Sequence, residues 1–190
     1  AEDGRPRETF WSRGIGADYL ALAFRWAHAA DPAAQLRYND YGGEGGGAKS
    51  DGIYDLAAGL RWQGAPIHGV GLQMHVGIED APPVAEVRIN MLRLAALGLQ
   101  TDITEMDVML KQPSTPAALR AQARIYRDML QACLAVAQCR GFSTWGATDR
   151  YSWIPEFFPG QGAALLFDEQ YRPKPAYRSV RRTLKSSLIR

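Results

Sequence analysis

The sequence lacks the features that would indicate a membrane or a nucleic-acid partner. It contains no run of about 18 apolar residues, so we expect no transmembrane helix. Its 22 Lys and Arg residues nearly balance its 20 Asp and Glu residues, and the formal net charge is only +2. Because these charges are spread along the chain and form no concentrated basic field, we expect no nucleic-acid partner.

Phosphate-binding and secretory motifs are also absent. The Gly-rich stretch 42–47 has neither the GxGxxG spacing of a dinucleotide site nor the Lys-Ser/Thr ending of a P-loop. The first residues, Ala1 to Arg5, show neither the basic nor the apolar segment of a signal peptide. The chain begins without Met and continues directly into turn-forming residues, so we expect that an upstream segment has been removed.

Cysteine is scarce, with two residues in the whole chain, Cys133 and Cys139. They lie six positions apart near the end of a predicted helix. A disulfide between them would stabilise the fold by about 2 kcal/mol and would indicate an oxidising, extracellular setting. Two buried thiols in a reduced protein would explain the same spacing equally well.

Strands and helices are predicted to alternate along the chain. With 46% hydrophobic and 22% charged residues, the composition is that of one globular domain. Apolar periodicity predicts helices over residues 17–30, 49–64, 84–97, 116–137 and 175–188. Short apolar runs predict strands over residues 35–41, 67–75, 99–108 and 141–147. This α/β order favours a parallel sheet of four βα units, and without a phosphate-binding motif we favour part of a (β/α)8 barrel over a doubly wound sheet.

Polar residues gather at the carboxyl end of every predicted strand. These residues are Asn39 and Asp40, Gln73 and His75, Glu105 and Asp107, and Thr148 and Asp149. In parallel α/β proteins the active site is built at that end of the strands. Side-chain alternation predicts two groups that each share one face of a strand: Gly69, Gly71, Gln73 and His75, and Thr101, Ile103, Glu105 and Asp107.

Glu105 is the candidate catalytic residue. A single Glu at a strand end is more often a structural carboxylate, but a neighbouring His and a second carboxylate can orient it as a nucleophile. His75 alone would more often be a core histidine. Trp145, Trp153 and Tyr41 have two interpretations, as core aromatics or as flat surfaces on which sugars stack.

Taken in order, the motifs of this chain resemble the second half of the family 10 glycoside hydrolases, which are endo-β-1,4-xylanases. The main matches are Tyr38-Asn39-Asp40-Tyr41, Gly69 to His75, Ile103 to Asp107, and Trp145 to Asp149. Further matches are Ser152-Trp153, Leu166-Phe167-Asp168, and Lys174-Pro175-Ala176-Tyr177. The cysteine pair resembles a disulfide common in bacterial members. The resemblance extends over residues 1–190 and implies a partial catalytic domain, the C-terminal half (strands 5–8) of a TIM (β/α)8 barrel whose N-terminal half is missing.

The resemblance implies a retaining hydrolysis of xylan. Glu105 would be the nucleophile that forms a glycosyl-enzyme, and His75 and Asp107 would form hydrogen bonds around it. Two carboxyl groups would lie about 5 to 5.5 Å apart across the cleaved bond. The family needs neither a metal nor an organic cofactor.

The resemblance also assigns the substrate contacts. Gln73, Trp145 and Trp153 would line the glycone subsites, and Asn39 and Tyr41 would lie on or near the aglycone side. The partner would be xylan or a xylo-oligosaccharide, and the protein would be secreted.

The sequence departs from the family pattern in four respects. Met74 stands where the family usually has Ser, and Gly42 replaces a frequent Asn. The family's Asn-Glu motif, which carries the general acid/base, is absent and is expected just upstream of Ala1, and Glu2 lacks the strand and the Asn that would make it a substitute. The first four strands are absent as well, so we expect two unpaired edge strands. The piece is then expected to aggregate, to pair with another half, or to be a portion of a longer protein.

Two other functions remain open from the sequence. One is a related barrel β-1,4-glucanase, because the catalytic carboxylates alone do not distinguish xylose from glucose. The other is a non-catalytic carbohydrate-binding half-barrel, in which the aromatic residues bind sugar and Glu105 is vestigial.

Overall fold

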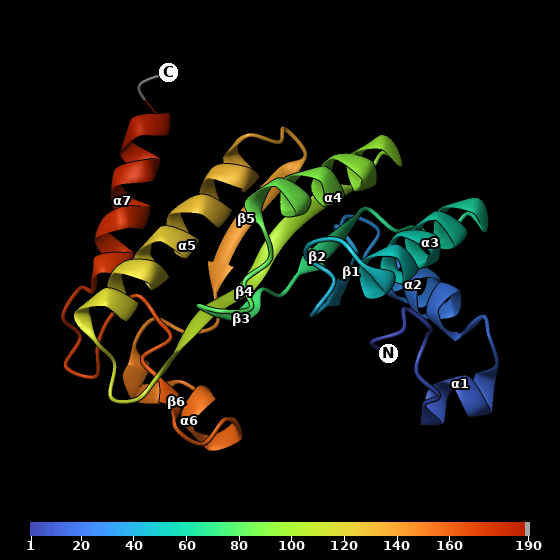
Figure 1. Ribbon diagram of the computed structural model, residues 1–190. Helices are drawn as coiled ribbons and strands as arrows, with labels where there is room; N and C mark the ends of the chain where they lie inside the picture. Colours follow the sequence, from blue (N-terminus) through green and yellow to red (C-terminus); the bar gives the residue numbers. More distant parts are fainter. Residues whose placement is uncertain (189–190) are drawn as a thin grey trace.

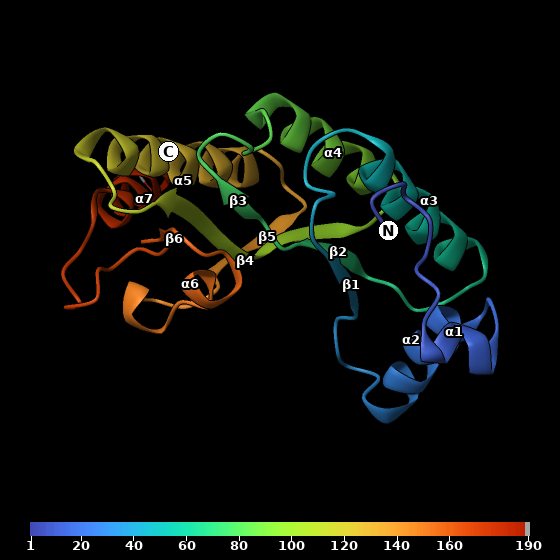
Figure 2. The same cartoon turned by 60° about the horizontal axis from the view of Figure 1, so that its bottom comes forward.

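The computed structural model describes residues 1–188, in which a curved sheet is covered by helices along one side (Figures 1 and 2). The helices are α1 (Phe10–Ile15), α2 (Tyr19–Ala30), α3 (Ala48–Trp62), α4 (Val84–Ala96), α5 (Pro116–Leu134), α6 (Ile154–Phe157) and α7 (Pro175–Ser187). The strands are β1 (Arg37–Asp40), β2 (Gly69–Leu72), β3 (His75–Gly77), β4 (Gln100–Lys111), β5 (Cys139–Thr144) and β6 (Gln161–Gly162).

The main sheet has the order β1-β2-β4-β5, and all three of its strand pairs are parallel. This confirms the predicted α/β class and the four parallel strands. Two short strands extend β4 beyond this sheet, since β3 pairs with its later residues in parallel and β6 pairs with its end in antiparallel fashion. Within residues 1–188, β1 pairs only with β2 and β5 only with β4, so the sheet has two open edges.

The core lies between the sheet and helices α3, α4 and α5. Its central side chains are all 2% exposed or less and come from both layers: Val70, Leu72 and Ile103 from the strands, and Ala57, Met91, Leu94, Tyr126 and Met129 from the helices. Burying one such large apolar side chain contributes about 1.5–3 kcal/mol. The side of the sheet that faces the helices is therefore a complete hydrophobic core.

The elements begin and end close to the predicted positions, with local exceptions. Helix α5 starts after Thr115, whose hydroxyl accepts a hydrogen bond from Ala118 N–H at 3.2 Å, and Pro116 occupies its first turn. Helix α1 was not predicted, because it is one short turn and a half with no buried residue. Strand β5 starts and ends earlier than the predicted 141–147, and Gly146 with a φ of 114° leaves the extended conformation.

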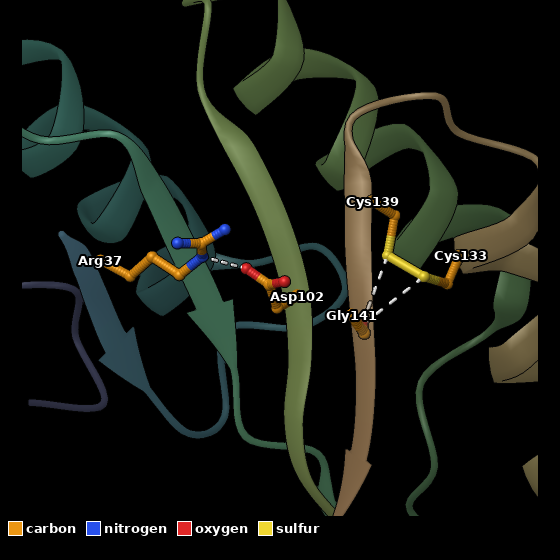
Figure 3. The surroundings of a disulfide bond; sticks show 5 residues. All are labelled: Arg37, Asp102, Cys133, Cys139 and Gly141. Carbon is orange, nitrogen blue, oxygen red and sulfur yellow. Dashed lines mark hydrogen bonds and ion pairs between the residues drawn. A yellow bond between two sulfur atoms is a disulfide. The ribbon is translucent and has the colours of Figure 1, made fainter. Parts of the chain in front are cut away.

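Cys133 and Cys139 form a disulfide that joins the end of α5 to the first residue of β5 (Figure 3). The pair fastens the helix layer to an edge strand of the sheet. None of the helices within residues 1–188 combines the length and the apolar content needed to cross a membrane.

The predicted strand 67–75 is interrupted, which corrects the prediction of one continuous strand. Met74 has a φ of 67°, a left-handed conformation that a non-glycine residue seldom adopts, and it separates β2 from β3. The alternation of faces survives the break, because Val70, Leu72, Met74 and Val76 all belong to the core. His75 therefore faces away from the core, as predicted.

Candidate active site

The candidate site lies at the carboxyl end of the sheet, and an irregularity in β4 brings Glu105 into it. Between Ile103 and Met106 the pairing of β4 with β5 shifts by one residue, as in a β-bulge. Before the shift the odd-numbered Thr101 and Ile103 are buried on the helix side, and after it the even-numbered Met106 and Val108 take that side. The predicted common face of Thr101, Ile103 and Glu105 is thus wrong, because the bulge reverses the alternation and turns Glu105 to the side away from the helices.

Glu105 is contacted on both carboxylate oxygens. Asn39 Nδ2, from the end of β1, donates to Glu105 Oε1 at 2.6 Å. His75 Nε2 lies 3.3 Å from Glu105 Oε2. Asn39 is itself oriented by Thr104 Oγ1, which donates to its Oδ1 at 2.7 Å. With a side chain that is 14% exposed, Glu105 is fixed in direction yet still accessible.

His75 connects Glu105 to a fully buried carboxylate. Its Nδ1 lies 3.0 Å from Oδ2 of Asp107, whose side chain is 0% exposed, and Trp153 Nε1 donates to the same oxygen at 2.8 Å. Burial alone would lower the pKa of His75, but the hydrogen bonds and charges of Asp107 and Glu105 raise it above the ordinary value of 6.5. The imidazole is thereby held between two carboxylates, one buried and one at the surface of the site.

Two tryptophans lie beside His75. The ring of Trp153 is centred 5.1 Å from the imidazole and that of Trp145 lies 6.2 Å away, both in edge-to-face arrangements. Trp153 also packs against Phe157 and Phe158 of the segment around α6. Trp145 is 50% exposed, so its side chain is accessible beside the polar end of the sheet.

The structure brings together six of the predicted site residues: Asn39, His75, Glu105, Asp107, Trp145 and Trp153. Asp40 contacts Tyr38 and Lys49 instead, and Thr148 donates to Asp168 O. Tyr41 contacts basic side chains, with Lys49 Nζ 3.5 Å from its ring centre and Arg7 donating to its hydroxyl. Gln73 is half-buried next to the break at Met74, and its carbonyl accepts from Glu105 N–H at 3.1 Å.

Asp149 lies outside this cluster, in a structural ion pair. Its Oδ2 lies 2.8 Å from Lys174 Nζ, and both side chains are 7% exposed. Burial raises the pKa of Asp149 and lowers that of Lys174, although each charge partly offsets the effect on the other. Glu2 is likewise engaged elsewhere, with Oε1 3.3 Å from Lys49 Nζ.

Small residues on the open face of the sheet make room for these polar groups. A Cβ atom at Gly71 would clash with Asn39 Oδ1, so a larger residue there would displace the Asn39 amide where it crosses β2. Lower on the same face, Arg37 of β1 reaches across Gly69 to bind Asp102 of β4 (Figure 3). This face is polar along its whole length.

Sequence reasoning did not find Glu44, Thr104 or Lys49. Glu44 is 4% exposed and Lys49 6%, and both come from the region of the Gly-rich loop and the start of α3. No sequence pattern predicted a role for Glu44, because its hydrogen-bond partners are backbone N–H groups, which are not specific to any residue type. Among residues 1–188, no group of three or more His, Cys, Asp or Glu side chains is arranged to hold a metal.

The chain matches one protein family and close relatives of known structure. Residues 1–183 match the model of glycosyl hydrolase family 10. The endo-1,4-beta-xylanase B of Thermotoga neapolitana is 42% identical over 189 residues, which are 99% of this chain and 54% of that protein. An endo-1,4-beta-xylanase 5 of Pyricularia grisea is 43% identical over 180 residues, 94% of this chain and 44% of that protein.

Solved structures give the same result for the fold. Native xylanase 10B from Thermotoga maritima superposes with a TM-score of 0.96 at 42% identity, covering 100% of this chain and 59% of that one. Xylanase 10B from Thermotoga petrophila RKU-1, solved with xylobiose, has a TM-score of 0.96 at 41% identity and covers 99% and 57%. The chain thus spans about half the length of the curated relatives it matches.

Proposed function

The chain belongs to glycosyl hydrolase family 10, and from this premise we propose that the protein carrying it is a retaining endo-1,4-β-xylanase in which Glu105 is the nucleophile. The observation that carries the proposal is the clamping of Glu105 between Asn39 and His75 at the carboxyl ends of the strands. A nucleophilic carboxylate must be oriented toward one carbon atom, and hydrogen-bonding groups at both of its oxygens fix that orientation.

In the proposed reaction, Glu105 attacks the anomeric carbon of a xylosyl unit. The bond from that carbon to the leaving oxygen breaks, a second carboxylic acid protonates this oxygen, and a glycosyl-enzyme ester forms on Glu105. The second group, now a carboxylate, then removes a proton from water, whose oxygen attacks the same carbon and releases Glu105. Configuration is retained because the carbon is inverted twice.

We place the general acid/base in the segment that precedes Ala1. Asp107 is unsuited to the role, since it is 0% exposed and is occupied by His75 and Trp153. Glu2 is unsuited as well, because its carboxylate is paired with the ammonium group of Lys49. The relatives are roughly twice as long as the match, which supports a further half of the barrel outside residues 1–190.

The same half would complete the sheet. Strands β1 and β5 each have one partner among the described residues, and a closed barrel would pair both free edges. We expect residues 1–190 alone to aggregate or to associate with a second half. Size-exclusion chromatography that gave a stable monomer, with a sharp unfolding transition, would contradict this.

We assign the sugar contacts by position around Glu105. Trp145 and Trp153, with Gln73, would bind the glycone side, and Asn39 the aglycone side close to the cleaved bond. Tyr41 would offer an aglycone sugar a restricted surface, because Lys49 Nζ lies 3.5 Å from its ring centre and Arg7 Cζ lies 5.6 Å from it. The similar xylanase 10B from Thermotoga petrophila RKU-1 was solved in complex with xylobiose, which favours xylan over a glucan as the substrate class.

We also propose that the protein acts outside the cell. The Cys133–Cys139 disulfide supports this, since such bonds persist mainly in oxidising compartments.

The proposal is tested by trapping the glycosyl-enzyme. The complete protein that carries this chain is treated with an aryl 2-deoxy-2-fluoro-xylobioside, which slows hydrolysis of the ester, and peptides are identified by mass spectrometry. We expect the label on Glu105. The matched Glu105→Gln variant should remain unlabelled, while a variant of the exposed Glu79, Glu79→Gln, should be labelled as usual.

Other outcomes decide between the remaining functions. Labelling by the fluoro-cellobioside in preference to the xylobioside would indicate a β-1,4-glucanase. Sugar binding by calorimetry without any label or turnover would indicate a non-catalytic binding module.

A further inference from the structure

We propose that Glu44 is a positioning residue, which holds the backbone at Gln73 and Met74 so that His75 reaches Glu105. This inference rests on the proposed function, in which Glu105 is the nucleophile. Glu44 lies in the loop between β1 and α3, belongs to none of the strands, and was not recognisable from the sequence.

Glu44 is buried and binds the backbone of two different loops. It is 4% exposed, and its Oε1 accepts from Gly42 N–H at 3.1 Å and from Met74 N–H at 2.9 Å. A single carboxylate oxygen thus joins the loop after β1 to the break between β2 and β3.

The break at Met74 needs such support. Its left-handed conformation, with a φ of 67°, is a strained one for a side chain of this kind. On the opposite side the same turn is bonded to β4, since Gln73 O accepts from Glu105 N–H at 3.1 Å and Met74 O from Asp107 N–H at 3.3 Å. The turn that precedes His75 is therefore held between Glu44 and the strand that carries Glu105.

Glu44 is itself anchored to the helix layer. Asn90 of α4 is 4% exposed, and its Nδ2 donates to Gly43 O at 2.8 Å and to Glu44 O at 3.1 Å. Arg93 Nε in turn donates to Asn90 Oδ1 at 2.8 Å. A chain of hydrogen bonds thus runs from α4 through the loop to the turn at Met74. Its last hydrogen bond, from Met74 N–H to Glu44, determines where the imidazole of His75 lies.

Three substitutions separate the acceptor of Glu44 from its charge and its length. In Glu44→Gln the amide carbonyl can still accept from both N–H groups. In Glu44→Asp the charge remains, but the acceptor is withdrawn by one methylene group. In Glu44→Ala both N–H groups lose their partner in a buried place.

Glu86, in the first turn of α4, provides a matched control because it binds the backbone of the same loop. Its Oε2 accepts from Gly46 N–H at 3.2 Å, in an exposed position that does not touch Met74. Glu86→Ala therefore loosens the loop without releasing the turn.

The experiment follows His75 directly, in the complete protein that carries this chain. The imidazole is titrated by NMR, and kcat and KM are measured on an aryl xylobioside. We expect Glu44→Asp and Glu44→Ala to shift the His75 titration toward lower pH, because His75 moves away from Glu105 and Asp107. We expect kcat to fall roughly 10- to 100-fold with KM little changed, because misplacement by about 1 Å has costs of this order. Glu44→Gln and Glu86→Ala should behave as the unaltered protein in both measurements.

Unchanged titration and kcat in Glu44→Asp, at a folded fraction equal to that of the unaltered protein, would overturn the proposal. A loss in Glu44→Gln would also overturn it, because a correctly placed neutral acceptor would then not be sufficient to hold the turn. The titration needs no turnover, so a protein that lacks xylanase activity would still show whether Glu44 positions His75. The failure of the proposed function and the failure of this inference are thus distinguishable.

Discussion

The two faces of the sheet β1-β2-β4-β5 differ in how complete they are. The helix-facing side is closed, with Val70, Leu72 and Ile103 packed against three helices and at most 1% exposed. The opposite side carries Arg37, Asn39 and glycines, and in Figure 2 the segment around β6 and α6 lies near one end of the sheet. Apolar contact holds the first side together, while polar pairs placed over glycines order the second. Stability and chemistry are therefore assigned to opposite sides of the same strands.

The largest effect is expected on the open side, at Glu105. Glu105→Gln should lower kcat by roughly 10,000-fold or more, since the loss of a nucleophile removes the covalent pathway. Steady-state kinetics on an aryl xylobioside would measure the loss. Denaturant unfolding should be nearly unchanged, because Gln can keep the hydrogen bond to Asn39. Turnover equal to that of the unaltered protein would remove Glu105 from the mechanism.

The next largest effect is expected on the closed side. Leu72 is 1% exposed, and Leu72→Ala should lower the free energy of unfolding by about 2–5 kcal/mol through lost burial and a cavity. The control is Leu92→Ala on α4, where Leu92 is 46% exposed and the change should stay within about 0.5 kcal/mol. Urea denaturation measures both. Equal losses in the two variants would contradict the division of the faces.

A single methyl group at Gly71 should separate activity from stability. In Gly71→Ala the new Cβ would meet Asn39 Oδ1 and push that amide away from Glu105. We expect kcat/KM to fall roughly 10- to 100-fold, while the free energy of unfolding changes by less than about 1 kcal/mol because a side-chain end can move aside. Gly59→Ala on α3, where nothing lies within 4 Å, is the matched control and should leave the kinetics unchanged. An unaffected kcat/KM in Gly71→Ala would show that the position of Asn39 does not matter.

The smallest effect is expected in the pH dependence of stability. The pKa of His75 is raised above 6.5 in the folded chain, so the folded state binds its proton more tightly than the unfolded state. This contribution is complete below pH 6.5 and is lost as the pH rises through the folded pKa. Denaturation at pH values on both sides of 6.5 should show a decline that is absent in His75→Gln. A decline that persisted in His75→Gln would have to come from other groups.

Much of this architecture could be predicted from the sequence, because apolar periodicity reports the closed face directly. The helices beginning near Ala48, Val84, Pro116 and Pro175 were located within a residue or two at their starts. The clustering of Glu105, His75 and Asp107 followed from polar residues at strand ends. The family assignment followed from ordered motifs and is confirmed by the match over residues 1–183.

The parts that could not be predicted are departures from regular alternation. The bulge between Ile103 and Met106 turns Glu105 to the open face, but a period-two pattern cannot register an inserted residue. The break at Met74 depends on Glu44, which is 30 positions away along the chain and acts through a backbone N–H. Local sequence patterns contain no information about such a long-range partner.

Strand β4 hydrogen-bonds to four others, β2, β3, β5 and β6, over its 12 residues. When the hydrogen bonds to one of these strands open, those between β4 and the other three remain. Amide protons at its centre should consequently exchange with solvent among the slowest in the molecule, whereas those of β1 should exchange early. Glu105 would then lie on the segment that unfolds last, and its position would be kept while the edges of the sheet open.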